Sequence, residues 1–247
     1  MKYFSIICML LVIVGCQPKV RKDKNLIEDI LILEVPYEKQ IKVLEELGYK
    51  LNDSIREEDI FGQLRELIDY GHKLSNNKVK TFVEENPYQD LYFTLGWTKY
   101  DKTSKKFITF TDKCIWYDLE FIDPTSSEYI TLMKRMGKIT NGELQFEDIE
   151  YTVDTDNNEW IKFKVNGIKK EWKLLQVGYI DDSFFTRFLY LTQEFNTKGR
   201  YTYFDNGSQQ FVIDYATPSE QKEFNEKTGL QRQWLTEGKH FSIPKDE

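Results

Sequence analysis

The sequence predicts an α+β fold, with a helical N-terminal third followed by an antiparallel sheet of a meander and hairpins on which further helices pack. Apolar residues recur at helical spacing up to about residue 95, and from residue 97 the apolar pattern changes to a period of two. Asn166-Gly167, between two alternating runs, is the strongest turn signal, because a type I′ hairpin needs positive φ at both central residues. We expect one globular domain over residues 26–247, with a weak internal boundary near residue 96.

Three helices are expected before that boundary. The first begins at Pro36 and stops at Gly48, because proline favours a first helical turn and glycine a helix end. The capping box Ser54-Ile-Arg-Glu57 opens the second, and Asn86-Pro87 opens a third, which Gly96 closes. We interpret their apolar stripes as core-facing.

The next segment is predicted to be a hairpin followed by a helix. Phe107–Thr111 and Cys114–Ile122 alternate as strands, with a turn at Asp112-Lys113. Pro124-Thr-Ser126 then leads into a helix that Gly137 stops.

The central meander is expected from Ile149 to Leu175, followed by a helix over Asp181–Phe195. A two-residue turn fixes the register, in which Val165 faces Ile168 and Ile161 faces Trp172. One face of the hairpin is predicted to be core, and it carries Ile161, Phe163, Val165, Ile168, Trp172 and Leu174.

The C-terminal part is expected to form another hairpin and a helix. Arg200–Phe204 pairs with Gln210–Ala216 across a glycine-containing turn. Thr217-Pro-Ser-Glu220 combines a capping box with proline at the first helical position, so a helix should run from there to about Gly229. A short strand between Trp234 and Phe241 completes the prediction.

Composition limits the possible partners. The chain has 247 residues, a net charge of −7, and acids and bases interspersed along it. Without a basic face, nucleic acid is not an expected partner. Glycine-rich phosphate loops are absent from the sequence, and we expect no cofactor and no metal.

The N-terminus has the pattern of a targeting segment. Residues 1–15 combine an early lysine with an apolar run of about 11 residues, which is too short to span a bilayer. Ile13-Val14-Gly15-Cys16 resembles the lipobox of bacterial lipoproteins, and this resemblance implies that Cys16 becomes the lipidated first residue, carrying acyl chains such as palmitate. Residues 16–25 would then tether the domain to the periplasmic or outer-membrane side of the envelope. The alternative is an ordinary secretory signal with a chance cysteine.

In a mature lipoprotein, Cys114 would be the one cysteine left with a thiol, since Cys8 leaves with the signal and Cys16 carries lipid. Its apolar surroundings favour a buried small side chain over a reactive thiol.

The sequence offers few catalytic constellations, and we expect no enzyme activity. His72 and His240 are far apart, which disfavours histidine metal sites and nucleophile–base triads. Asp118 and Glu120 alternate on one face of a strand with Trp116 and could act as acid and base on a glycoside, but a solvated strand face is the favoured explanation. Asp154–Glu159 imitates half a calcium loop, yet it lacks the required glycine and final glutamate, so a polar turn is favoured.

Aromatic residues among acids are the remaining sign of binding. Tyrosines in such surroundings suit protein recognition or sugar stacking, although partial burial in the core is the simpler explanation; they are Tyr179, Tyr190, Tyr201, Tyr203 and Tyr215. The residues that we expect on a binding surface are Asp118, Glu120, Tyr179, Asp181 and Asp182.

Several short motifs, in this order, are similar to immunity-type proteins of bacterial polymorphic toxin systems. They are Leu47-Gly48, Pro87-Tyr88, Leu95-Gly96, Trp116-Tyr-Asp-Leu-Glu120, Trp160, Trp172, Asp181-Asp182-Ser-Phe184, Gln209–Tyr215, Thr217-Pro-Ser-Glu220 and Gly229-Leu230. The resemblance implies a stoichiometric role, in which an acidic surface binds and blocks a toxin-like protein without catalysis. The alternatives are an envelope lipoprotein that is structural or binds glycan, and a hydrolase using Asp118 and Glu120.

Overall fold

A computed structural model describes residues 35–64, 86–118, 126–175, 180, 183–205 and 210–236. The predicted signal peptide, Cys16 and its tether therefore lie outside the described residues. Among the residues that are described, no helix combines the length and the apolar character needed to cross a membrane.

The first helices form close to where the sequence places them. Helix α2 (Tyr37–Glu46) follows Pro36, and the chain leaves it through Gly48, whose φ is +93°. Helix α5 (Gln89–Leu95) is preceded by Asn86, whose side chain accepts a hydrogen bond from the backbone N–H of Tyr88 at 2.9 Å.

The predicted start of the second helix is wrong by about two residues. Helical residues begin at 57, and the Asp59 carboxylate accepts the backbone N–H of Arg56 at 3.0 Å. The Ser54 capping box is therefore not used. Asp59, the third helical residue, accepts the hydrogen bond from the backbone N–H of Arg56, the residue that precedes the helix.

The nine described strands form three antiparallel sheets. Strands β1 (Thr98–Asp101) and β2 (Lys106–Thr109) form a hairpin. The second sheet has the order β3-β8-β7-β9 and contains β3 (Cys114–Asp118), β7 (Arg200–Asp205), β8 (Gln210–Ala216) and β9 (Gln233–Trp234). The third sheet is the meander of β4 (Phe146–Val153), β5 (Glu159–Val165) and β6 (Ile168–Lys173).

The predicted fold, a helical N-terminal third followed by one antiparallel sheet, is wrong. Helices α6 (Ser126–Lys138), α7 (Ser183–Glu194) and α8 (Pro218–Thr228) alternate with the strands through the rest of the chain. The predicted hairpin at Asp112-Lys113 does not form either, since β2 pairs with β1 and β3 pairs with β8. Local turn signals identify neighbouring strands only, whereas the β3–β8 pairing joins segments almost 100 residues apart.

The predicted meander is confirmed in its register. Val165 pairs with Ile168 and Ile161 with Trp172, while Asn166 and Gly167 have φ of 49° and 80°, as a type I′ turn requires. Of the predicted core face, Ile168 is exposed at the strand end and the other five residues are buried.

Helix α6 passes through Gly137, the expected stop, and ends at Lys138. A Cβ at Gly137 would lie 2.6 Å from the Phe146 ring, so this glycine allows close helix–sheet packing. The capping box of α8 is confirmed, with Thr217 and Glu220 bonded reciprocally and Gly229 left-handed at the end.

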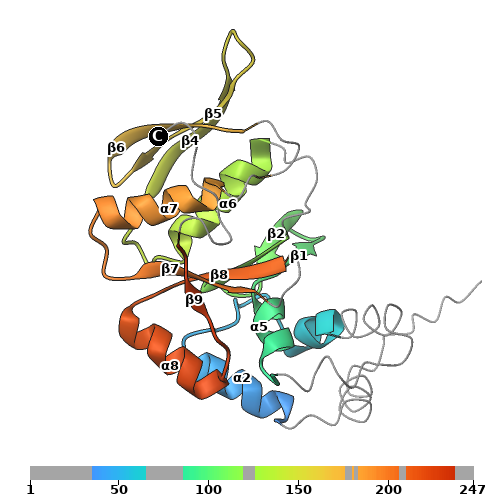
Figure 1. Cartoon of the computed structure of the whole chain (residues 1–247). Coiled ribbons are helices and arrows are strands. Elements are labelled where there is room, and N and C mark those ends of the chain that lie inside the picture. The colour runs from blue at the N-terminus through green and yellow to red at the C-terminus, as the bar shows by residue number, and fades with distance from the viewer. Residues whose placement is uncertain are drawn as a thin grey trace, which may run out of the picture.

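The elements are stacked in four layers, which follow one another from top to bottom in Figure 1. The meander lies on α6 and α7, these helices lie on the four-stranded sheet, and α8, α2 and α5 lie beneath that sheet (Figure 1). Two hydrophobic cores result. The first core lies on the α6 and α7 side of the four-stranded sheet and includes Met133, Met136, Trp172, Phe184, Phe188, Tyr201 and Ile213. The second core lies on the other side and includes Leu44, Tyr49, Tyr92, Cys114, Val212 and Phe224.

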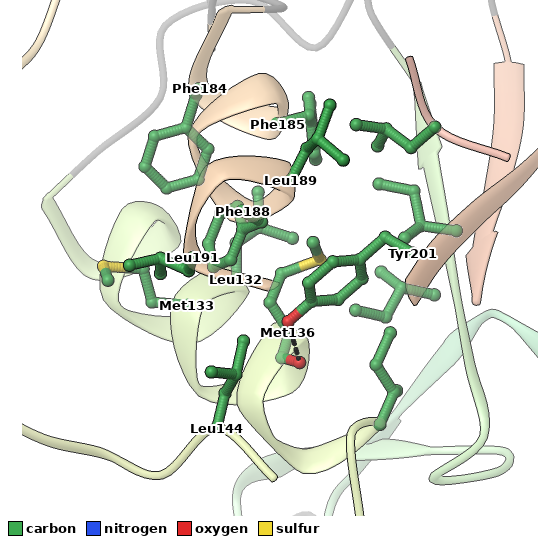
Figure 2. Packing of buried hydrophobic residues seen from close by; sticks show 14 of the residues in the cluster. Leu132, Met133, Met136, Leu144, Phe184, Phe185, Phe188, Leu189, Leu191 and Tyr201 are labelled. Atoms are coloured by element: carbon green, nitrogen blue, oxygen red, sulfur yellow. Dashed lines mark hydrogen bonds between the residues drawn. The ribbon is translucent and has the colours of Figure 1, made fainter. Parts of the chain in front are cut away.

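The first core joins the two helices to strand β7, as Figure 2 shows. Phe188 of α7 and Met136 of α6 lie beside Tyr201 in this cluster (Figure 2). The Tyr201 hydroxyl donates a hydrogen bond to the Met136 carbonyl oxygen at 3.0 Å, so the buried phenol is satisfied at a helix end.

Gly96 and Gly62 make a pair of variants for testing the packing of Gly96 against Trp116 at the second core. A Cβ at Gly96 would lie 2.4 Å from the backbone nitrogen of Trp116, whereas a Cβ at Gly62 would meet nothing within 4 Å. We expect Gly96→Ala to lower the free energy of unfolding by about 1–3 kcal/mol, because backbone must move. Gly62→Ala should raise it by up to about 1 kcal/mol, because alanine favours a helix. Urea denaturation measures both, and equal changes would contradict the close approach at Gly96.

Candidate functional site

The most concentrated polar cluster lies inside the second core, around Asp214 of β8. Asp214 is 0% exposed, and its Oδ2 accepts hydrogen bonds from the Tyr49 hydroxyl, the Tyr92 hydroxyl and Arg232 Nη1. Arg232 Nη1 also donates to the Tyr49 oxygen at 2.6 Å, and Arg232 Nε donates to Gln221 Oε1 at 2.6 Å. We call these five residues the Asp214 network. Tyr49 follows α2, Tyr92 belongs to α5 and Asp214 to β8. Gln221 belongs to α8 and Arg232 follows it, so the network ties distant parts of the chain together.

Burial and the neighbouring charges set the ionisation of this network. Burial raises the pKa of Tyr49 and of Tyr92 well above the usual range of tyrosine. Burial acts to lower the pKa of Arg232, but Tyr49 and Asp214 outweigh it and the pKa is raised. Tyr49 and Tyr92 therefore act as neutral donors, and a buried ion pair joins Asp214 to Arg232.

Cys114 lies in the second core and is 1% exposed. Burial, followed by the Asp214 charge, raises the pKa of its thiol. The prediction that Cys114 is buried is confirmed.

A pocket of about 270 Å³ opens over the edge of the Asp214 network, between α2 and α8. Tyr49 and Arg232 contribute to its lining, as do Lys113, Glu220 and Glu223. The two carboxylates already have partners. Glu220 accepts a hydrogen bond from the Thr217 backbone N–H at 2.7 Å, and Glu223 forms an ion pair with Lys227 at 2.9 Å. The charged groups that line the pocket therefore already hold parts of the fold together, and they are not set up to bind a ligand.

Asp118 is the one member of the predicted binding surface that the structure describes. Glu120, Tyr179, Asp181 and Asp182 lie outside the described residues, and so do His72 and His240.

Asp118 ends β3 and accepts a hydrogen bond from Gln210 Nε2 at 3.0 Å. Asp205 ends β7 on the other side of β8, at the same end of the sheet. We call Asp118 and Asp205 the acidic strand ends. Both side chains are half-buried.

The predicted polar turn at residues 154–158 is confirmed. The Asp154 carboxylate accepts the backbone N–H of Asp156 and of Asn158, and also the Trp160 Nε1–H at 2.9 Å. These bonds, led by the one from Trp160, lower the Asp154 pKa to about 2. Among the described residues there is no group of histidine, cysteine and carboxylate side chains suited to hold a metal ion.

Most of the tyrosines singled out in the sequence lie in the core. Tyr201, Tyr203 and Tyr215 are buried and Tyr190 is half-buried. Among the described residues, the exposed aromatic side chains are instead Tyr100, which is 50% exposed, and Phe107, which is 71% exposed. They face each other across the β1–β2 hairpin, a pairing that the predicted hairpin at Asp112-Lys113 excluded.

Tryptophans do not form a flat sugar-binding platform in the described part of the chain. Trp97 and Trp116 have ring centroids 5.0 Å apart, but their planes are tilted by 47° and both side chains are half-buried. Trp116 packs on the second core beside Gly96.

No protein-family model, curated protein or solved structure matches this chain.

Proposed function

We propose that this chain is a membrane-anchored lipoprotein of the bacterial envelope. It binds a protein partner and does not catalyse a reaction. The partner we propose is toxin-like, and the role is that of an immunity-type protein that neutralises it stoichiometrically. The lipobox-like sequence at Cys16 supports the anchor, and a net charge of −7 supports binding to a basic surface.

The acidic strand ends are the observation that carries the binding proposal. Asp118 and Asp205 lie at one end of the four-stranded sheet, on two strands that flank the start of β8. Glu120 follows Asp118 by two residues in the sequence. Asp118 pairs with Gln210 and Asp205 with Phe211, so the two side chains lie on opposite faces at the same end of the sheet. Negative charge at a sheet end attracts a basic partner without needing a cleft.

The Asp214 network supports a binding role over a catalytic one. The pKa values of Tyr49, Tyr92 and Arg232 are raised, yet these side chains are enclosed and bonded to Asp214 and to one another. A general acid or base has to come within hydrogen-bond reach of a substrate, and Asp214 is 0% exposed. We therefore assign this network to stability.

Membrane attachment is tested by growing cells with labelled palmitate. Label is expected on the wild-type chain and on Cys8→Ala, whose cysteine leaves with the signal, but not on Cys16→Ala. Label retained by Cys16→Ala would refute the anchor.

Partner binding is tested by capture of the affinity-tagged chain from membranes of cells that also express its neighbouring genes. We expect one protein to be recovered in equal amount, and recovery to fall roughly tenfold when Asp118 and Asp205 are both replaced by lysine. The control carries the same charge change at Glu147 and Glu150, two exposed residues of β4. Equal losses from both variants would remove the acidic strand ends from the proposal. Recovery of no protein, with retention of the chain on cell-wall polysaccharide, would favour the glycan-binding alternative.

A further inference from the structure

The far end of the β1–β2 hairpin combines exposed aromatic side chains with lysines. Tyr100 and Phe107 are cross-strand partners whose ring centroids lie 5.4 Å apart in an edge-to-face arrangement. Lys102 and Lys105, in the turn, and Lys106, on the other face of β2 from Phe107, are exposed at the same end of the hairpin. We call these five residues the hairpin tip.

The hairpin tip is positively charged within an acidic chain. No ion pair within the described ranges involves Lys102, Lys105 or Lys106. The nearby Asp101 carboxylate accepts the backbone N–H groups of Thr103 at 3.1 Å and Ser104 at 2.9 Å, so it closes the turn.

The hairpin is held to the body through its other face. Ile108 packs against the second core, and Lys99 pairs with Asp59 at 2.7 Å. At the base, Asn52 Nδ2 donates to the Thr109 carbonyl oxygen at 2.8 Å. Successive residues of a strand point to opposite faces, so Tyr100 and Phe107 are turned away from Lys99 and Ile108.

We propose that the hairpin tip contacts the anionic headgroups of a lipid bilayer. Aromatic side chains gather at the level of lipid headgroups, and clustered lysines are attracted to anionic leaflets. Lysine is depleted in protein interfaces, and a stable interface buries about 800 Å² on each partner, more than five side chains on a hairpin offer. The proposal rests on the Cys16 anchor only in that the anchor would raise the local concentration of the tip at the membrane.

The test places a fluorescent reporter at the tip of the whole chain, purified as the cell makes it. Cys114 is buried, so Thr103→Cys supplies an exposed thiol for a nitrobenzoxadiazole label that brightens on contact with lipid. Thr155→Cys, in the exposed β4–β5 turn, is the matched control. The vesicles contain either phosphatidylcholine alone or phosphatidylcholine with phosphatidylglycerol at three to one.

With the phosphatidylglycerol vesicles, the label at position 103 should brighten about twofold, while the label at position 155 should not change. Replacing Lys102, Lys105 and Lys106 together by glutamine should reduce that response roughly tenfold, and Phe107→Ser should reduce it as well.

Three outcomes would overturn the proposal. If the chain binds vesicles but the fluorescence of the label at position 103 does not change, the anchor holds the chain on the membrane and the hairpin tip does not touch lipid. A chain absent from both vesicle types would contradict the anchor together with the tip. A label that brightens only when a captured protein partner is added would assign the tip to that protein.

Discussion

Replacing Asp214 by alanine is expected to lower the free energy of unfolding by about 3–5 kcal/mol, which is the cost of leaving a buried charge without its partner. The Arg232 side chain is 2% exposed, and its guanidinium would lose its carboxylate partner. The hydroxyls of Tyr49 and Tyr92 would lose their acceptor at the same time. Urea denaturation followed by circular dichroism measures the change.

Two further variants serve as controls for this measurement. Asp156→Ala, in the exposed β4–β5 turn, should change stability by no more than about 0.5 kcal/mol. The double variant Asp214→Leu with Arg232→Met removes both charges, so it should regain much of the loss and should fold even if Asp214→Ala does not. A cost for Asp214→Ala no larger than that for Asp156→Ala would contradict the Asp214 network.

Replacing Phe188 by alanine is expected to lower the free energy of unfolding by about 3–5 kcal/mol, because it leaves a cavity in the first core. Phe188 is 0% exposed. Its ring centroid lies 5.8 Å from Phe146 of β4, 5.3 Å from Trp172 of β6 and 5.7 Å from Tyr201 of β7. One side chain of α7 therefore joins the meander to the four-stranded sheet.

The control for this cavity is Phe107→Ala, which removes the same side chain from an exposed position and should cost no more than about 0.5 kcal/mol. Phe188→Leu should cost less than Phe188→Ala, since leucine fills part of the space. Similar losses for Phe188→Ala and Phe107→Ala would refute the packing of the first core.

Turns and helix starts that depend on a few neighbouring residues could be predicted from the sequence. Asn166-Gly167 specified its hairpin and its register because the turn needs left-handed backbone at both positions. Thr217 and Glu220 specified a helix start because they bond to each other's backbone groups.

Features built from distant segments were not readable. The pairing of β3 with β8 and the bond from Tyr49 to Asp214, across 165 residues, depend on packing that no local pattern reports. One signal for the network was present: Asp214 is a lone acid between Val212-Ile213 and Tyr215-Ala216, and a carboxylate in such a run needs a buried partner.

The candidate binding surface could be predicted only in part for the same reason. Asp118 was predicted to lie on a strand, and it is the last residue of β3. Phe107 was taken as a strand residue paired toward Cys114, so its exposure beside Tyr100 was missed once the wrong strand partner was chosen.

The most direct test of the proposed function is a calorimetric titration of the captured partner with the purified chain. We predict one partner bound per chain, an affinity that falls as salt rises, and a loss of affinity in the variant with lysine at positions 118 and 205. A toxin-like activity of the partner should disappear at the equivalence point. Neutralisation by a small fraction of an equivalent of this chain would indicate turnover, and it would contradict a non-catalytic binding role.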